Sequence, residues 1–139
     1  MKFEIIYMPK DNKQLKILLI DDDRFLLDMY SLKFKKLGLD VDTSGNSAAA
    51  LEKLKTGKAY DIVLIDIIMP GMDGIEFLKT IRKEKLLEDG VIIMLTNQAD
   101  DEGQAKALGV DGYIIKATAI PSEVCDQVFA IYQSKKNKK

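Results

Sequence analysis

Three short, uninterrupted apolar runs constrain the fold of this chain more than any other feature of its sequence. They span residues 17–20, 62–65 and 91–95, and consist only of Ile, Leu, Val and Met. Such runs are typical of strands in a parallel sheet that helices cover on both faces. Residues 39–43 instead alternate in polarity, which predicts a half-exposed edge strand. Residues 113–115 form a fifth, shorter candidate.

Amphipathic patterns predict helices between these strands. Phe25, Met29 and Leu32 recur at helical spacing and are expected to form the buried face of the first helix. Ser47 is expected to cap a second helix over residues 48–55. Further buried helix positions are predicted at Phe77, Leu78 and Ile81, and at Val124, Val128 and Ile131, with Pro121 in the first turn of the last helix.

The alternation of strands and helices sets the fold class. Five strand–helix repeats predict an α/β fold with right-handed crossovers. Residues 99–108 have few apolar anchors, so the fourth helix is expected to be marginal. In open α/β sheets, ligands bind beyond the carboxyl ends of the strands. We therefore look for functional side chains at that edge.

Length and charge indicate one domain without a strongly charged partner. We expect a lead-in over residues 1–14, a domain over 15–134 and a basic tail over 135–139. A fragment at residues 3–7 offers an additional short strand. The net charge of −1, from 21 basic and 22 acidic residues, gives no argument for binding nucleic acid or a membrane surface. The tail is interpreted as a solvated run at the end of a helix.

Missing and rare residue types exclude several kinds of chemistry. The chain contains no histidine, which excludes Ser-His-Asp and Cys-His catalysis and histidine metal sites. Cys125 is the only cysteine and is expected to be a small buried hydrophobe. A single cysteine, with no apolar stretch near the ~20 residues of a membrane span, favours a cytoplasmic protein.

Polar side chains stand where the predicted strands end. Asp21–Asp23 follow the first strand, Asp66 the third and Lys116 the fifth, while Thr96 ends the fourth. We expect them to converge, because parallel strands end at one edge. Clustered carboxylates need a neutralising cation, and an oxygen-only ligand set selects a hard cation such as Mg²⁺. A nearby hydroxyl and ammonium suit a phosphoryl group, which a carboxylate nucleophile accepts as an aspartyl phosphate.

Taken one at a time, most of these residues also have a purely structural interpretation. Asp22 and Asp23 suit the start of a helix, and Thr96 suits a turn. Lys116 alone suits a solvated surface. Asp66 is different, because a carboxylate directly after a four-residue apolar run is costly when it is buried without a partner.

Four stretches of the sequence together resemble the receiver domain of response regulators. They are Ile17–Asp22, Asp61–Gly74 with its Asp-x-x-Met-Pro-Gly-Met-Asp-Gly loop, Ile92–Thr96 and Gly112–Lys116. The resemblance runs from about Lys16 to Tyr132, and the loop is its most specific part. It implies a flavodoxin-like, doubly wound sheet of five parallel strands in the order 2-1-3-4-5, with five helices.

The resemblance also implies roles for individual residues. Asp66 would be the phosphoacceptor, and Lys116 would pair with the phosphoryl group. Thr96 would move to hydrogen-bond a phosphoryl oxygen, and Tyr113 would reposition with it. The implied Mg²⁺ ligands are Asp22, Asp66, Asp21 through water, and the backbone carbonyl of Ile68. Asp23 has no family role and is interpreted as a charge at a helix start.

Three positions depart from the family pattern. Ala117 stands where the family usually has a proline in a cis peptide bond. Asn97 stands where a small residue is usual, and Asn97 and Gln98 are expected to crowd or hydrogen-bond the phosphoryl group and so to change reaction rates. Ile68 has no polar side chain to position a hydrolytic water, so we expect slow loss of the phosphoryl group.

The resemblance implies a signalling protein that catalyses only its own phosphorylation and dephosphorylation. A sensor histidine kinase or a histidine phosphotransfer protein would supply the phosphoryl group. The surface of the fourth helix, fifth strand and last helix would then signal to a downstream protein target. We expect no binding to membranes or nucleic acid by this domain. We expect a monomer or a phosphorylation-dependent dimer, with Cys125, Phe129 and Tyr132 as a second apolar stripe on the last helix.

Three alternatives remain open on the sequence alone. A pseudo-receiver that binds partners without phosphorylation is compatible with Asn97 and Ala117. A phosphohydrolase resembling the haloacid dehalogenase superfamily would use Asp21–Asp23 as its Asp-x-Asp motif. That assignment leaves Asp66 without a role, and no acidic pair follows Lys116 to complete the metal site. A flavodoxin-like FMN binder would need a phosphate loop rich in Gly, Ser and Thr after the first strand, which the sequence lacks.

Overall fold

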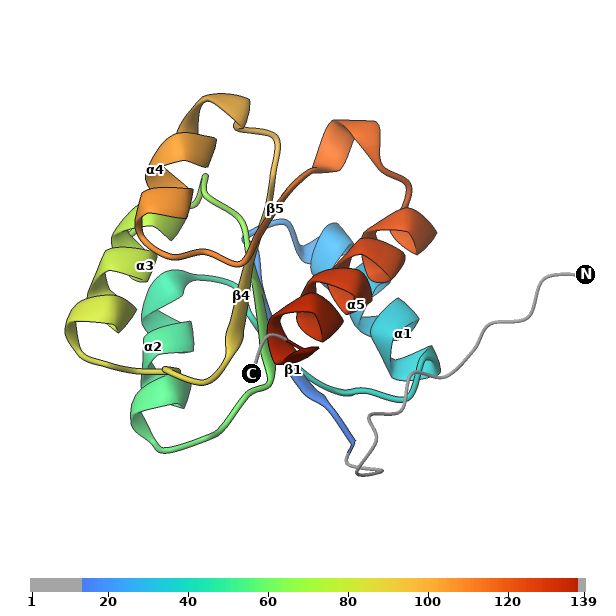
Figure 1. Cartoon of the computed structure of the whole chain (residues 1–139), viewed down its shortest axis with the longest axis horizontal. Helices are drawn as coiled ribbons and strands as arrows, with labels where there is room; N and C mark the ends of the chain where they lie inside the picture. Colours follow the sequence, from blue (N-terminus) through green and yellow to red (C-terminus); the bar gives the residue numbers. More distant parts are fainter. Residues whose placement is uncertain (1–13, 138–139) are drawn as a thin grey trace, which may run out of the picture.

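The five predicted strands form one parallel sheet in the order β2-β1-β3-β4-β5, which confirms the expected fold class. The computed structural model describes residues 14–137 (Figure 1). Its elements in chain order are β1 (Lys16–Ile20), α1 (Arg24–Lys36), β2 (Asp40–Ser44), α2 (Ser47–Lys55), β3 (Ile62–Ile65), α3 (Gly74–Lys83), β4 (Val91–Thr96), the short 3₁₀ helix η1 (Ala99–Asp101), α4 (Glu102–Ala107), β5 (Gly112–Ile115), the 3₁₀ helix η2 (Lys116–Thr118) and α5 (Pro121–Asn137). The candidate strand at residues 3–7 lies outside the described residues.

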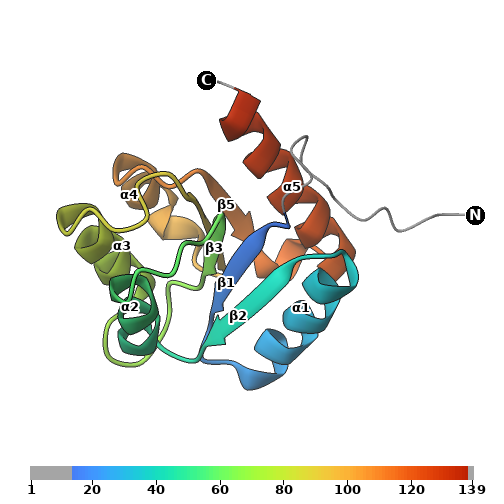
Figure 2. The same ribbon diagram turned by 90° about the horizontal axis from the view of Figure 1, so that it is seen from below.

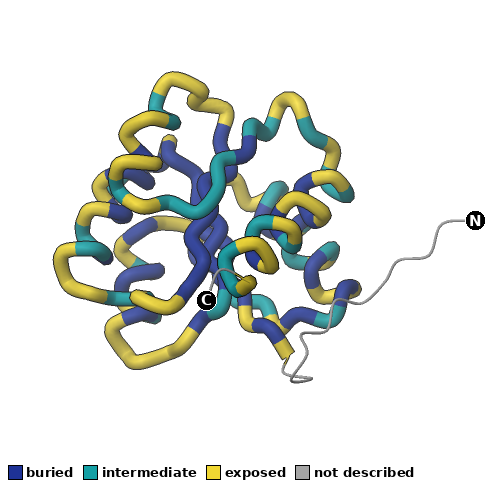
Figure 3. The backbone as a smooth tube through the Cα atoms, in the orientation of Figure 1, coloured by how far each residue is buried: buried dark blue, intermediate teal, exposed yellow. Residues whose placement is uncertain are grey.

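Helices cover both faces of the sheet, as the uninterrupted apolar strands require. Figures 1 and 2 show α2, α3 and α4 on one side of the sheet and α1 and α5 on the other. Every side chain of β3 and β4 is buried, and the strands form the dark centre of Figure 3. The edge strand β2 is mostly half-exposed, as its alternating sequence predicts. Among residues 14–137 no helix combines the length and the apolar character needed to cross a membrane.

The buried face of α1 differs from the predicted one. Leu27, Tyr30 and Phe34 point into the core. By contrast, Phe25 is 74% exposed and Leu32 is 57% exposed. The prediction was wrong because α1 carries apolar residues on two faces, and helical spacing alone does not say which face meets the sheet.

The second helix begins one residue earlier than predicted. Asn46 is its N-cap, and its Oδ1 accepts a hydrogen bond of 2.8 Å from the backbone N–H of Ala49. Ser47, the predicted cap, is the first helical residue and is buried.

The predicted face of α3 is confirmed, and α5 begins at Pro121 as expected. On α5, Val124 and Val128 are buried as predicted, whereas Ile131 is half-buried and packs against the core. The short α4 buries only Ala105 within the described chain, in agreement with its predicted weakness.

The last helix has no free second apolar stripe. Cys125 and Tyr132 are buried in the core, which confirms the prediction for Cys125. Phe129 packs edge-on against Phe34 of α1, with ring centroids 6.2 Å apart. These side chains bind α5 to α1, so the predicted stripe is not available to a partner.

The beginning of the basic tail is not a solvated run either. Helix α5 continues to Asn137, and the Lys135 ammonium lies 2.8 Å from the backbone carbonyl oxygen of Gly90 and 3.2 Å from a carboxylate oxygen of Asp111. The same Asp111 oxygen accepts a 2.8 Å hydrogen bond from the backbone N–H of Ile92. Lys135 therefore fixes α5 at the amino end of β4.

Candidate functional site

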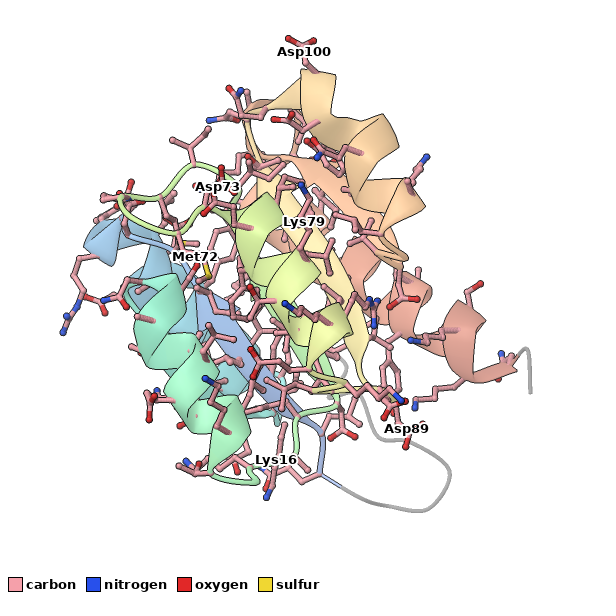
Figure 4. The ribbon with its side chains drawn as sticks, turned by 90° about the vertical axis from the view of Figure 1, so that its left-hand side faces the viewer. Lys16, Met72, Asp73, Lys79, Asp89 and Asp100 are labelled. Carbon is pink, nitrogen blue, oxygen red and sulfur yellow. The ribbon has the colours of Figure 1, made fainter. Side chains whose placement is uncertain are left out.

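All strands point their carboxyl ends toward the same edge of the sheet, and the predicted site residues lie there. Figure 4 shows Asp73 and Asp100 at this end of the molecule, with Lys16, which begins β1, and Asp89 at the opposite end. The pairing of β1 with β3 ends at Ile20 and Ile65, and the pairing of β4 with β5 ends at Thr96 and Ile115. The sheet consequently holds the next residues of each pair of strands side by side, Asp21 next to Asp66 and Asn97 next to Lys116.

Three carboxylates meet directly after β1 and β3. One oxygen from each of Asp21, Asp22 and Asp66 lies within 4.8 Å of the others. Asp21 and Asp66 are each only 8% exposed, whereas Asp22 faces solvent. Three negative groups this close repel one another, so the site favours a cation among them.

The Lys116 ammonium lies between two of these carboxylates. Its Nζ donates to Asp21 Oδ2 at 2.6 Å and to Asp66 Oδ2 at 2.9 Å. Burial favours the neutral amine, but the hydrogen bonds to Asp21 and Asp66 outweigh it and raise the pKa of Lys116. The lysine, whose side chain is 12% exposed, is therefore a largely buried, charged partner of the cluster rather than a surface charge.

Burial and hydrogen bonds shift the pKa of Asp21 in opposite directions. Burial raises the pKa of Asp21, and the hydrogen bonds from Lys116 and from the backbone N–H of Asp23 oppose that rise. Asp23 itself caps α1, because its Oδ1 accepts from the backbone N–H of Leu26 at 3.2 Å. This confirms the structural interpretation of Asp23.

The loop after β3 turns tightly around Asp66. The backbone N–H of Gly74 donates to the carbonyl of Ile67 at 2.8 Å, and Asp73 caps α3 through the N–H of Glu76. A β-carbon at position 74 would lie 2.4 Å from the carbonyl oxygen of Asp66, so only glycine fits there. The side chain of Ile68 points outward and is 57% exposed.

The residue Gln98 connects the end of β4 to β5. Thr96 is fully buried, and its hydroxyl accepts from the backbone N–H of Gln98 at 3.2 Å. The Tyr113 hydroxyl donates to the backbone carbonyl of Gln98. Burial, reinforced by Asp101 and Glu102 of the next turn, raises the pKa of Tyr113 to about 12. Tyr113 is therefore a neutral hydrogen-bond donor near pH 7.

The Asn97 side chain, which its position beside Thr96 led us to expect near the phosphoryl group, binds the turn after β5 in this structure. Its Oδ1 accepts a hydrogen bond of 2.9 Å from the backbone N–H of Ala117. Every peptide bond in the described chain is trans, including the one between Lys116 and Ala117. Ala117 thus offers an N–H that proline lacks. Sequence patterns gave no signal for this bond, which joins two loops.

The sequence also missed Tyr30, which lies below the carboxylates. A cavity of about 10 Å³ is lined by Asp21, Asp66 and Tyr30 together with apolar residues of β1, α1, β3 and β4. Burial raises the pKa of Tyr30. An aromatic residue in an amphipathic helix normally indicates the core, so nothing in the sequence marked it as a neighbour of the site.

The donor set fits Mg²⁺. Three carboxylates within 4.8 Å of one another supply the hard oxygen ligands that this ion prefers, and exposed Asp22 leaves one side open to water. No sulfur or imidazole ligand joins the described cluster, which excludes the usual zinc ligand sets.

Comparison with known proteins agrees with this geometry. The family described as response regulator receiver domain matches residues 17–127. Chemotaxis protein CheY-3 of Vibrio cholerae is 35% identical over 123 residues, which cover 85% of this chain and 94% of that protein. The alkaline phosphatase synthesis transcriptional regulatory protein PhoP of Bacillus subtilis is 32% identical over 116 residues. That match covers 84% of this chain but 48% of PhoP, so the chain spans about half the length of this relative.

A solved structure supports the same assignment. The response regulator protein TrrA of Thermotoga maritima, in complex with Mg²⁺–BeF, matches with a TM-score of 0.73 and 30% identity. The match covers 85% of this chain and 99% of TrrA. The matched family spans most of the chain, and the sheet order and the carboxylate cluster agree with it. This chain belongs to the response regulator receiver domain family, a family of signalling domains.

Proposed function

We propose that this receiver accepts a phosphoryl group on the Asp66 carboxylate. A carboxylate oxygen attacks phosphorus in line, the P–O bond forms as the P–N bond of a phosphohistidine breaks, and the imidazole leaves with the bonding electrons. The observation that carries this proposal is the contact of the Lys116 ammonium with both Asp66 and Asp21, beside a third carboxylate. A positive charge at this place stabilises the charge that builds up on the transferred group.

We assign the metal ligands from the same cluster. Asp22 and Asp66 would hold Mg²⁺ directly, Asp21 through water, and the backbone carbonyl of Ile68 would complete the protein ligands. Bound Mg²⁺ would neutralise charge on the phosphoryl oxygens. The exposure of Asp22 leaves its carboxylate open to an incoming hydrated ion.

The switch in this proposal consists of Thr96 and Tyr113. The Thr96 hydroxyl accepts only a 3.2 Å hydrogen bond in this state, so its proton is available to a phosphoryl oxygen. A movement of Thr96 would be passed on through Gln98 to Tyr113, and from there to the surface of α4, β5 and α5. A two-state equilibrium that the phosphoryl group shifts is sufficient for signalling.

The phosphoryl donor in this proposal is a sensor histidine kinase or a histidine phosphotransfer protein. Three large apolar side chains within four positions of site residues in the sequence are exposed: Phe25 at the start of α1, Ile68 in the loop after β3, and Ile120 in the loop before α5. They are 74%, 57% and 61% exposed. Such side chains suit docking of a protein donor around the acidic site. The output is contact with a downstream protein, as a monomer or a phosphorylation-dependent dimer.

The test is the intact mass of the protein after incubation with Mg²⁺ and acetyl phosphate. We expect one added phosphoryl group in the wild type, and none in Asp66→Asn or when Mg²⁺ is removed by a chelator. No adduct together with undetectable Mg²⁺ binding would favour a pseudo-receiver. Continuous release of inorganic phosphate without an adduct would favour a phosphohydrolase.

A further inference from the structure

One side chain joins the two loops that carry Thr96 and Lys116. The sheet's last β4–β5 register pair is Thr96 with Ile115, and the backbone pairing stops there. One residue beyond the end of β4, Asn97 Oδ1 accepts from the backbone N–H of Ala117 at 2.9 Å. The Asn97 carboxamide thus continues the connection between β4 and β5 beyond the end of the sheet.

The local hydrogen bonds of the turn that carries Lys116 are long. The N–H of Ala119, directly after η2, lies 3.4 Å from the carbonyl oxygen of Lys116, and the Thr118 hydroxyl lies 3.2 Å from the carbonyl oxygen of Ile115, directly before η2. Both distances are long for hydrogen bonds of these types. The bond from Ala117 to Asn97 is shorter than either, so it contributes more to the position of this turn.

The segment on the other side of this bond is fixed at each of its three residues. Thr96 is buried and accepts from Gln98, Asn97 binds Ala117, and the Gln98 carbonyl accepts from Tyr113. A displacement of Thr96 therefore also displaces the partner of Ala117, which is the residue after Lys116. The two groups that the proposed function assigns to the phosphoryl oxygens are therefore mechanically connected through Asn97.

We propose that Asn97 is a positioning residue that holds Lys116 and Thr96 in register, so that the ammonium and the hydroxyl reach the phosphoryl group together. The inference rests on the phosphoryl-accepting function proposed above. Asn97 acts through the backbone N–H of Ala117. Its loss slows phosphorylation of Asp66 and leaves the three carboxylates in place.

The experiment is a double-mutant cycle on the rate of phosphorylation by acetyl phosphate at saturating Mg²⁺. The proteins are the wild type, Asn97→Ala, Ala117→Pro and the double variant. Proline removes the N–H to which Asn97 binds. We expect Asn97→Ala to react about fivefold more slowly than the wild type, the factor that a hydrogen bond of ~1 kcal/mol provides. In the Ala117→Pro background, Asn97→Ala has no further effect.

Two measurements separate positioning from a general structural defect. The Kd for Mg²⁺, measured by calorimetry, stays within about twofold of the wild type in Asn97→Ala, because one distant neutral hydrogen bond is lost and no ligand. The control variant Gln104→Ala removes an exposed amide from α4 and retains the wild-type rate. Amide hydrogen exchange of Ala117 becomes faster in Asn97→Ala and not in Gln104→Ala.

The inference is overturned if Asn97→Ala reacts as fast as the wild type, or if its effect is equally large in the Ala117→Pro background. A weakened Mg²⁺ affinity that accounts for the whole change in rate overturns it as well. These results differ from failure of the proposed function, in which the wild type itself accepts no phosphoryl group.

Discussion

Replacing Lys116 with methionine removes the ammonium between Asp21 and Asp66 and keeps most of the apolar side chain. The three side chains are only 11–12% exposed, and Nζ lies 2.6 and 2.9 Å from the two carboxylates. Removing one partner of a buried ion pair costs ~3–5 kcal/mol, because the other charge stays buried without compensation. Solvent still reaches Asp22 beside them, so we expect the lower end of this range, a loss of about 3 kcal/mol in the free energy of unfolding.

The assay is urea unfolding at pH 7 without Mg²⁺, with Lys106→Met as the control. Lys106 also makes an ion pair, 2.9 Å from Glu102, but the two side chains are 63% and 45% exposed. Exposed pairs contribute at most about 1 kcal/mol, so the control is expected to lose less than that. Added Mg²⁺ is expected to restore part of the stability of Lys116→Met, because a cation again neutralises the carboxylates.

The pH dependence of this loss has a defined sign. Burial raises the pKa of Asp21 above its ordinary 3.8, and Lys116 opposes the rise. Without Lys116 the folded state binds more protons than the unfolded state, so stability increases as pH falls through the raised folded pKa toward 3.8. The difference between Lys116→Met and the wild type is therefore expected to shrink as the pH falls from 7 toward 3.8. A loss below 1 kcal/mol, or one that is independent of pH and Mg²⁺, would refute this account of the site.

Three further predictions concern individual side chains. Phe25→Ala is expected to slow transfer from a phosphohistidine protein about tenfold, a typical loss for an aromatic anchor; equal slowing with acetyl phosphate, measured in parallel, would contradict a docking role. Ile68→Gln is expected to shorten the lifetime of phosphorylated protein, followed by phosphate release, because the amide orients a hydrolytic water; an unchanged lifetime contradicts this. Tyr60→Phe is expected to lower stability by ~1 kcal/mol at pH 7. The Tyr60 hydroxyl donates a 2.5 Å hydrogen bond to Asp42 Oδ2 and, together with Lys58, holds the pKa of Asp42 below its ordinary 3.8. This contribution is therefore present above pH 3.8 and lost in stronger acid; urea unfolding that shows the same loss at pH 7 and well below pH 3.8 would contradict it.

The strands and most of the site could be predicted because each depends on local sequence. Uninterrupted apolar runs require burial on both faces, and parallel strands bring their ends to one edge, so Asp21, Asp66 and Lys116 were expected to meet. Their contacts in the structure agree with that expectation.

What could not be predicted depends on how elements are placed relative to one another. Phe25 and Leu27 are both strongly apolar, so the sequence does not indicate which of them is buried. The turn at Asp23, where α1 begins, sets the face of the helix that meets the sheet. The bond from Asn97 to Ala117 joins residues 20 positions apart whose loops meet only in the folded chain. Lys135 was interpreted as solvated because its partner Asp111 is also distant in sequence.

The most direct test of the central claim is to locate the phosphoryl group after transfer from a phosphohistidine protein. Borohydride reduces an aspartyl phosphate to homoserine, which peptide mass analysis identifies by its position. We predict homoserine at position 66 in the presence of Mg²⁺, and none in Asp66→Asn. A modified residue elsewhere in the chain, or transfer that continues unchanged in Asp66→Asn, would contradict the proposal.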